Sequence, residues 1–221
     1  MILLASKSSG RLATLRAAGV EPLVRVSSVD EETVLGELIR RRRDAGLPAP
    51  SAAEQVQALA RAKALDVMTS TDPQEAEVVV GCDSMLEIAG QVVGKPADAA
   101  QARERWRMMS GGTGTLHTGH FLVRTADGTT AEGVSSATIR FGSPSPAEVE
   151  AYIASGEPLW CAGAFTIDGL GGAFIEGIDG DPHGVVGISL PLLRRLLAAL
   201  GVVWTDLWAP PPATKPVDDA H

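Results

Sequence analysis

The chain opens with Met1-Ile-Leu-Leu-Ala-Ser-Lys-Ser-Ser-Gly-Arg11, and this stretch decides how the fold begins. The apolar run 2–5 predicts a buried strand, and the small polar residues after it predict a turn. Arg11 begins a helical pattern that Gly19 ends. Free amides and the dipole at such a helix start attract an anion, so this geometry suits phosphate. The alternative is an ordinary capped helix, because serine and glycine are common N-cap residues.

Composition indicates a globular chain of one domain, or of one domain with two lobes. Its 221 residues are 45% hydrophobic and 21% charged. The net charge of -8 argues against a nucleic-acid coat and against a protein that binds anionic membranes. The two cysteines show neither a disulfide framework nor a metal motif. Because the sequence has no apolar leader and no membrane-length segment, a cytoplasmic location is expected.

Strand and helix patterns alternate in the first half of the chain, and strands dominate the middle. This order predicts an α/β or α+β fold with a mixed sheet. Residues 1–208 are expected to form the single domain, and 209–221 a flexible tail rich in proline. The expected strands are 2–5, 23–27, 77–81, 115–125 and 131–141, with a hairpin at 86–93; the expected helices are 10–18, 31–44, 51–68, 97–109, 145–155 and 190–200.

Acidic residues follow two of the expected strands. Asp83 comes directly after the apolar strand 77–81, and Asp30-Glu31-Glu32 follows the strand 23–27. Ligands of open α/β sheets bind beyond the carboxyl ends of strands. Carboxylates there could hold a divalent metal or take a proton from water. The alternatives are a turn-capping role for Asp83 and a favourable helix N-terminus for the acidic triplet.

Two lysines and a run of arginines are candidates for phosphate binding. Lys95 precedes a proline and is therefore held in an extended backbone, and Lys63 lies on a helix face among alanines. Either lysine suits phosphate neutralisation, although ordinary surface lysines are far more common. The run Arg40–Arg43 is interpreted as a solvated helix end rather than as a polyanion site.

Several sequence blocks, taken together and in order, resemble the Maf proteins, a family of nucleoside triphosphate pyrophosphatases. The similarity covers about residues 2–201 of the chain. The matching blocks are Leu4-Ala5-Ser6-Lys7-Ser8-Ser9-Gly10-Arg11, Val29-Asp30-Glu31, Leu59-Ala60-Arg61-Ala62-Lys63-Ala64, Gly81-Cys82-Asp83-Ser84, Gly94-Lys95-Pro96, and the stretch from Tyr152 through Ala162-Gly163-Ala164-Phe165 to Gly180-Asp181-Pro182-His183-Gly184-Val185-Val186-Gly187.

The resemblance implies an elongated α/β fold of the Maf and inosine-triphosphatase type, with a mixed curved sheet and a central cleft between two lobes. It implies a hydrolase of acid anhydrides that converts a nucleoside triphosphate into the monophosphate and diphosphate with Mg²⁺ or Mn²⁺. Asp83 is then the carboxylate that activates water, and Glu31 joins it in the metal site. A homodimer is a further expectation from the family. The implied substrate-binding residues are Ser6, Ser8, Arg11, Lys63, Ser84, Lys95 and Asp168.

The chain departs from the family pattern at five positions. Ser9 and Gly10 stand where the family has a proline and an arginine, and Cys161 stands where a lysine is common. Ser84 replaces a frequent threonine and keeps the hydroxyl. Asp168 stands where members that cleave thymidine and uridine triphosphates carry glutamine. A carboxylate only accepts hydrogen bonds, so a pyrimidine preference does not carry over.

Two other functions are compatible with the sequence. The first is a nucleotide-binding regulator of septum formation and cell division with little turnover, because two basic residues of the family pattern are replaced. The second is a related pyrophosphatase of the inosine-triphosphate type. A panel of nucleoside triphosphates separates all three readings by pyrophosphate release and base preference.

Overall fold

A computed structural model describes residues 1–209, so the expected proline-rich tail, 209–221, lies outside the described residues except for Ala209. Within the described chain a seven-stranded sheet has the order β2-β1-β3-β5-β6-β7, with β4 paired to β3. Strands β2, β1 and β3 run parallel and the remaining pairs are antiparallel, which confirms the predicted mixed sheet. The strands are β1 (Ile2–Leu4), β2 (Leu23–Val24), β3 (Val78–Ile88), β4 (Gln91–Val93), β5 (Thr113–Arg124), β6 (Thr130–Phe141) and β7 (Ile175–Asp179).

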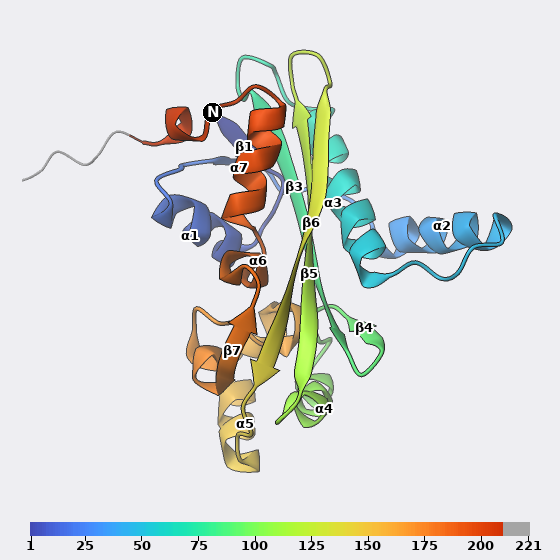
Figure 1. Ribbon diagram of the computed structural model, residues 1–221, viewed down its shortest axis with the longest axis vertical. Helices are drawn as coiled ribbons and strands as arrows, with labels where there is room; N and C mark the ends of the chain where they lie inside the picture. The colour runs from blue at the N-terminus through green and yellow to red at the C-terminus, as the bar shows by residue number, and fades with distance from the viewer. Residues whose placement is uncertain (210–221) are drawn as a thin grey trace, which may run out of the picture.

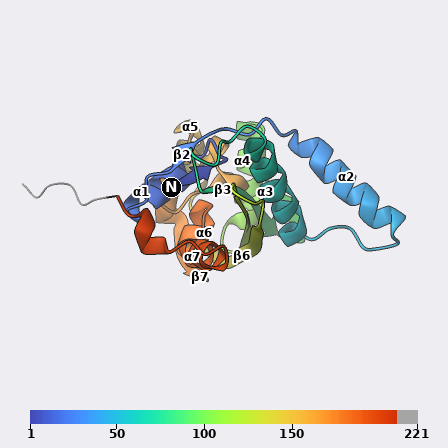
Figure 2. The same cartoon turned by 90° about the horizontal axis from the view of Figure 1, so that it is seen from above.

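The long strands β3, β5 and β6 run along most of an elongated molecule (Figure 1). Helix α3 covers one side of these strands, while α1, α6 and α7 lie on the other side, and α4 and α5 lie at the far end (Figure 1). Figure 2 shows α2 projecting away from the body of the molecule. The helices are α1 (Ser9–Ala17), α2 (Glu31–Asp44), α3 (Ala52–Met68), α4 (Ala99–Met109), α5 (Pro146–Ala154), α6 (Pro182–Val186) and α7 (Leu190–Ala199).

Helix starts follow the capping signals of the sequence. The Ser51 hydroxyl accepts from the Glu54 amide at 3.3 Å, and the Glu54 carboxylate accepts from the Ser51 amide at 2.9 Å. This reciprocal pair satisfies amides that the first turn leaves free. At the end of α2, Arg42 donates to the Pro48 carbonyl at 2.7 Å and pairs with Glu54. Arg40, Arg41 and Arg43 are exposed at the end of α2, as expected of a solvated helix end.

Two glycines allow α3 to lie directly against the sheet. A Cβ atom at Gly81 would stand 2.2 Å from the Ala60 carbonyl oxygen, and one at Gly119 would stand 2.5 Å from the Val56 carbonyl oxygen. Gly81 and Gly119 lie on the adjacent strands β3 and β5. Backbone contact of this kind is open only to glycine. It fixes the height of α3 above the sheet, and with it the position of Lys63.

Apolar side chains form a cluster at each end of the sheet. Near the top of Figure 1, α7 packs on the sheet through Leu193 and Leu197, next to Val80. At the other end, Trp106 makes edge-to-face contacts with Phe141 and Tyr152, with ring centroids 6.2 and 5.6 Å apart. Such pairs add to the stability gained from buried area. The two clusters form the two lobes that the resemblance implied.

Some strand boundaries differ from the sequence predictions. The strand expected at 77–81 continues to residue 88, so the prediction that Asp83 follows a strand end is wrong. The reason is a continuous antiparallel ladder with β5, in which Asp83 pairs with Gly119 and Ser84 with Thr118. Strand β7 and helix α6 form within the glycine-rich stretch 163–187, where no element was predicted. Within residues 1–209, no helix combines the length and apolar character needed to cross a membrane.

Candidate active site

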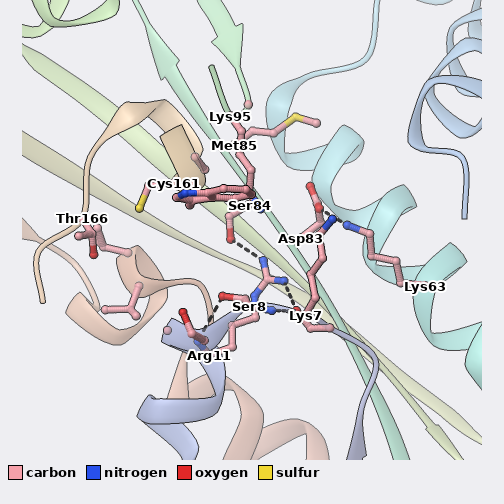
Figure 3. Close-up of a pocket in the computed structure, with 18 of the residues that line it drawn as sticks. Lys7, Ser8, Arg11, Lys63, Asp83, Ser84, Met85, Lys95, Cys161 and Thr166 are labelled. Carbon is pink, nitrogen blue, oxygen red and sulfur yellow. Dashed lines mark hydrogen bonds and ion pairs between the residues drawn. The ribbon is translucent and has the colours of Figure 1, made fainter. Parts of the chain in front are cut away.

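A cavity of about 1020 Å³ opens between the two lobes, beside the middle of β3. Its walls come from the turn that leads into α1, from the centre of β3 and from loops of the opposite lobe. Figure 3 shows Lys7, Arg11, Lys63, Asp83 and Lys95 around this space. The lining residues are those at 5–11, 26, 27, 29, 31, 63, 83–85, 94, 95, 157, 160–162, 165, 166, 168, 169, 185 and 186.

Two carboxylates share one lysine at the cavity wall. The Lys63 Nζ atom lies 2.6 Å from Asp83 Oδ1 and 2.6 Å from Glu31 Oε1. Asp83 projects from β3 toward α3, which carries Lys63, and Glu31 is the first residue of α2. The side chains of Asp83 and Lys63 are 10% and 14% exposed, whereas that of Glu31 is 55% exposed. The cluster is thus buried at Asp83 and open at Glu31.

Burial raises the pKa of Asp83, and the neighbouring Lys63 and Arg11 cations oppose this shift. Burial removes water from the charged form of the carboxylate, which makes a proton easier to hold. A carboxylate with a raised pKa is a better proton acceptor than an ordinary aspartate, because general-base strength follows basicity. Asp83 is thus a buried carboxylate with a raised pKa that lines the cavity.

Arg11 is fixed by acceptors from three segments of the chain. Its Nε–H donates to the Gly187 carbonyl at 2.7 Å, and its two terminal nitrogens donate to Ser6 Oγ at 2.9 Å and Ser84 Oγ at 3.1 Å. A guanidinium has five N–H groups, so two remain for a ligand. Ser8 caps α1 by accepting from the Arg11 amide at 3.4 Å. The turn thus holds a buried arginine with free donors at the cavity.

The Ser84 hydroxyl, which accepts a hydrogen bond from Arg11, is itself held by the Thr118 hydroxyl. Ser84 Oγ lies 2.8 Å from Thr118 Oγ1, and Thr118 donates to the Gly184 carbonyl at 2.8 Å. Thr118 is fully buried. The sequence analysis did not single out Thr118. The only signal for it was the cross-strand register, because Thr118 stands opposite Ser84 in the β3–β5 ladder.

Lys95 completes a group of cations around the cavity. Burial lowers the pKa of Lys95, and the nearby Arg11, Lys7 and Lys63 charges lower it further. Arg105 donates to the Lys95 carbonyl at 3.2 Å and so holds this loop from behind. Because these cations repel one another, binding of an anion between them is favourable.

The opposite lobe contributes Asp168 and Cys161. Asp168 accepts a hydrogen bond from the Thr166 hydroxyl, and both residues line the cavity. Burial raises the pKa of the Cys161 thiol to about 11, with further contributions from Glu157 and Asp168. Cys161 is therefore a neutral thiol that adds no charge to the cavity.

Two carboxylates at the cavity wall, Glu31 and Asp83, are oxygen donors of the kind that a divalent cation binds. Among residues 1–209, no group of three or more His, Cys, Asp or Glu side chains is arranged to hold a metal ion. The Lys63 ammonium, however, already occupies a cationic position between the Glu31 and Asp83 carboxylates. Mg²⁺ is commonly held by one or two carboxylates, with water and substrate phosphates filling the other positions. Glu31 and Asp83 fit that pattern.

The structure brings most of the sequence-predicted site residues to one cavity, whereas Asp30 and Glu32 of the acidic triplet do not line it. Phe165 and Trp160, which the sequence analysis did not single out, line it as well. Asp30 is separate from the cavity lining and caps α2, its carboxylate accepting from the Glu32 amide at 3.2 Å. The predicted residues that line the cavity are Ser6, Ser8, Arg11, Glu31, Lys63, Asp83, Ser84, Lys95 and Asp168.

Comparison with known proteins adds a family and relatives. A family model described as Maf-like protein matches residues 1–200. A Streptomyces coelicolor protein is 50% identical over 209 residues, which is 95% of each chain. A Rhodococcus jostii protein is 51% identical over 212 residues, covering 93% of this chain and 95% of its own. A Salinispora tropica protein is 49% identical over 217 residues, covering 97% and 90%. All three are named nucleoside triphosphate pyrophosphatase.

Proposed function

The chain belongs to the Maf family, and we propose that its cavity hydrolyses a nucleoside triphosphate to the monophosphate and pyrophosphate. The observation that carries the proposal is a buried carboxylate, Asp83, next to a group of convergent cations in one cavity. The protein is thus a hydrolase of acid anhydrides, the class to which its named relatives belong.

In the proposed reaction Asp83 takes a proton from a water molecule as that water attacks the α-phosphorus. A bond forms between the water oxygen and the α-phosphorus, and the bond from that phosphorus to the bridging oxygen breaks. The electron pair leaves with pyrophosphate. Lys63 keeps Asp83 in place, since its ammonium lies 2.6 Å from Asp83 Oδ1. Phosphoryl transfer depends on such positioning and on charge stabilisation.

The phosphates are proposed to lie against the turn 6–11. Arg11 offers its two remaining N–H groups, and Lys7 and Lys95 add positive charge. Ser6 and Ser84 act by holding the guanidinium, to which both accept hydrogen bonds. The amides at the start of α1 add partial positive charge. Ser8 contributes as the cap of that helix.

Charge balance in the cavity gives a reason for a divalent metal. Four cationic and four carboxylate side chains line it, so its side chains carry no net charge. A triphosphate brings about four negative charges, which the side chains alone leave unbalanced. Mg²⁺ or Mn²⁺, held by Glu31 and Asp83, would supply positive charge and polarise the phosphate oxygens. The lining charges are Lys7, Arg11, Lys63 and Lys95, with Glu31, Asp83, Glu157 and Asp168.

Other features of the proposal rest on the family and on composition. We propose one domain over residues 1–208, a cytoplasmic location, a homodimer, and no nucleic-acid or membrane partner. Asp168 is proposed to face the base, where a carboxylate would accept from ring or exocyclic N–H groups.

The test is the variant Asp83→Asn, assayed for pyrophosphate against a panel of nucleoside triphosphates with Mg²⁺. The amide keeps the shape but cannot accept the proton, so kcat is expected to fall by about 10²–10⁴-fold while nucleotide binding by calorimetry persists. Asp44→Asn, in an exposed position at the end of α2, is the matched control and keeps full activity. Full activity in Asp83→Asn would remove Asp83 from the mechanism.

A second function, a nucleotide-binding regulator with little turnover, is favoured by one observation. Cys161 and Gly10 leave the cavity with fewer cations than the family pattern would give it. Saturable binding across the panel with no pyrophosphate from any nucleotide would support this alternative and exclude the enzyme.

A further inference from the structure

An exposed tryptophan stands at the rim of the cavity. Trp160 is 76% exposed and lines the cavity at the end of a 3-10 helix, Glu157–Trp160. Val26, which is 57% exposed, lines it from the other lobe. An aromatic side chain exposed at the rim of a cleft offers an apolar face that a bound ligand can cover.

The segment that carries Trp160 is well anchored. The Glu157 carboxylate accepts from the Leu170 and Gly171 amides at 3.0 Å each, and Pro158 is buried. Beyond Trp160, the Gly163 amide donates to the Gly94 carbonyl at 2.9 Å. The exposure of the indole is therefore a property of a fixed backbone and not of a loose loop.

This anchoring also places Trp160 next to the cationic part of the cavity. The charges of Lys95 and Asp168 act on the pKa of the next residue, Cys161. Gly94, to which the segment is bonded, precedes Lys95. A nucleotide whose phosphates lie against Lys95 would carry its base one ribose away, on the side where Trp160 and Asp168 line the wall.

We propose that Trp160 stacks on the nucleobase and makes the enzyme favour purine over pyrimidine nucleotides. Every base has a π face, and purines offer the larger one, so an indole gives binding to all bases with a bias toward purines. This inference rests on the proposed function, because it takes the ligand to be a nucleotide.

The first test compares Trp160→Ala with Trp160→Phe in steady-state assays on purine and pyrimidine triphosphates. Loss of one stacking platform is expected to raise KM for purine triphosphates about tenfold, with a smaller rise for pyrimidines. Because the base lies away from the reacting phosphorus, kcat is expected to hold, and phenylalanine restores most of the affinity. Trp208→Ala is the matched control, since Trp208 is 55% exposed and stands outside the cavity.

The second test uses inorganic tripolyphosphate, which has the charges of the substrate but no base. Its inhibition constant is expected to be the same in wild type and Trp160→Ala. An unchanged purine KM in Trp160→Ala, or an equal loss of affinity for tripolyphosphate, overturns the proposal.

The two proposals can fail separately. If the wild-type protein released no pyrophosphate from any nucleotide, the proposed reaction would fail. Stacking would still be measured by quenching of tryptophan fluorescence on nucleotide binding. That quenching is expected to disappear in Trp160→Phe and to remain in Trp208→Phe; quenching that persists in Trp160→Phe overturns the inference.

Discussion

Substituting Gly81 by alanine tests whether the contact between α3 and the sheet sets the geometry of the site. The added Cβ atom would lie 2.2 Å from the Ala60 carbonyl oxygen and 2.8 Å from the Ala64 amide nitrogen. These are backbone atoms of α3, so no side-chain rotation relieves the overlap. The helix has to withdraw from β3.

The size of this withdrawal follows from contact distances. Ordinary van der Waals contact begins near 3.4 Å, so α3 has to retreat by about 1.2 Å at Ala60. Lys63 moves with the helix. The Lys63–Asp83 contact, 2.6 Å in the native structure, would lengthen to about 3.8 Å, beyond hydrogen-bond range.

Both stability and activity are expected to respond. Overpacking of a core typically costs about 1–3 kcal/mol, and a clash with backbone belongs at the upper end. For a chain of this size, that corresponds to a fall in Tm of about 6–12 °C. Misplacement of a catalytic group by about 1 Å can cost about 10²-fold, so kcat/KM at a temperature where the variant is folded should fall by that order.

Gly36→Ala is the matched control for this experiment. Gly36 lies in the exposed helix α2, and nothing stands within 4 Å of its Cβ position. Alanine there is expected to raise stability by about 0.5–1 kcal/mol and leave kcat/KM unchanged. The measurements are thermal unfolding and pyrophosphate release. A Gly81→Ala protein with wild-type Tm and kcat/KM would refute the argument that Gly81 sets the distance between α3 and the sheet.

Two further predictions concern the neighbours of the reacting groups. Lys63→Met is expected to move the acid limb of the kcat/KM profile to higher pH. The Lys63 charge lowers the pKa of Asp83, which burial raises. Without Lys63, Asp83 is protonated at a higher pH, so activity is lost earlier on acidification. A limb at the wild-type position, measured by pyrophosphate release across a pH series, would contradict this role. Thr118→Val is expected to destabilise the fold by about 0.5–1.5 kcal/mol in urea unfolding, because the Gly184 carbonyl loses one of its two donors and keeps only the Gly187 amide at 3.2 Å. It should also raise KM through the Ser84 hydroxyl that positions Arg11, and an unchanged KM would show that Arg11 needs no such support.

Local signals predicted the helices well. The Ser51–Glu54 capping box and the proline at the first position of α5 are signals contained within a few residues. The first strand and the turn into α1 were predicted for the same reason. Asp83, Lys63 and Lys95 could be chosen because charged residues next to apolar strands or helix faces need a partner.

The pairing of strands that are distant in the sequence could not be predicted from local sequence patterns. Polar residues at 83 and 84 resemble a strand end, yet β3 continues because β5 offers an unbroken antiparallel partner. The relay through Thr118 exists only once that register is known. In the glycine-rich stretch 163–187, β7 forms by pairing with β6, a contact between segments about forty residues apart that no local periodicity reveals. The stacking surface of Trp160 likewise depends on which lobe the loop faces.

Gly10 lies where the start of α1 meets the end of α6. A Cβ atom at Gly10 would stand 3.1 Å from Val186 Cγ1, closer than ordinary contact. The same close approach brings the Gly187 carbonyl to 2.7 Å from Arg11 Nε. Because the nearest atom is the tip of a side chain, a longer residue at position 10 is expected to displace the Val186 side chain by a few tenths of an ångström, so Val186 is compatible with the arginine of the family pattern. Arg11, held by three acceptors, is the proposed phosphate contact that this turn keeps.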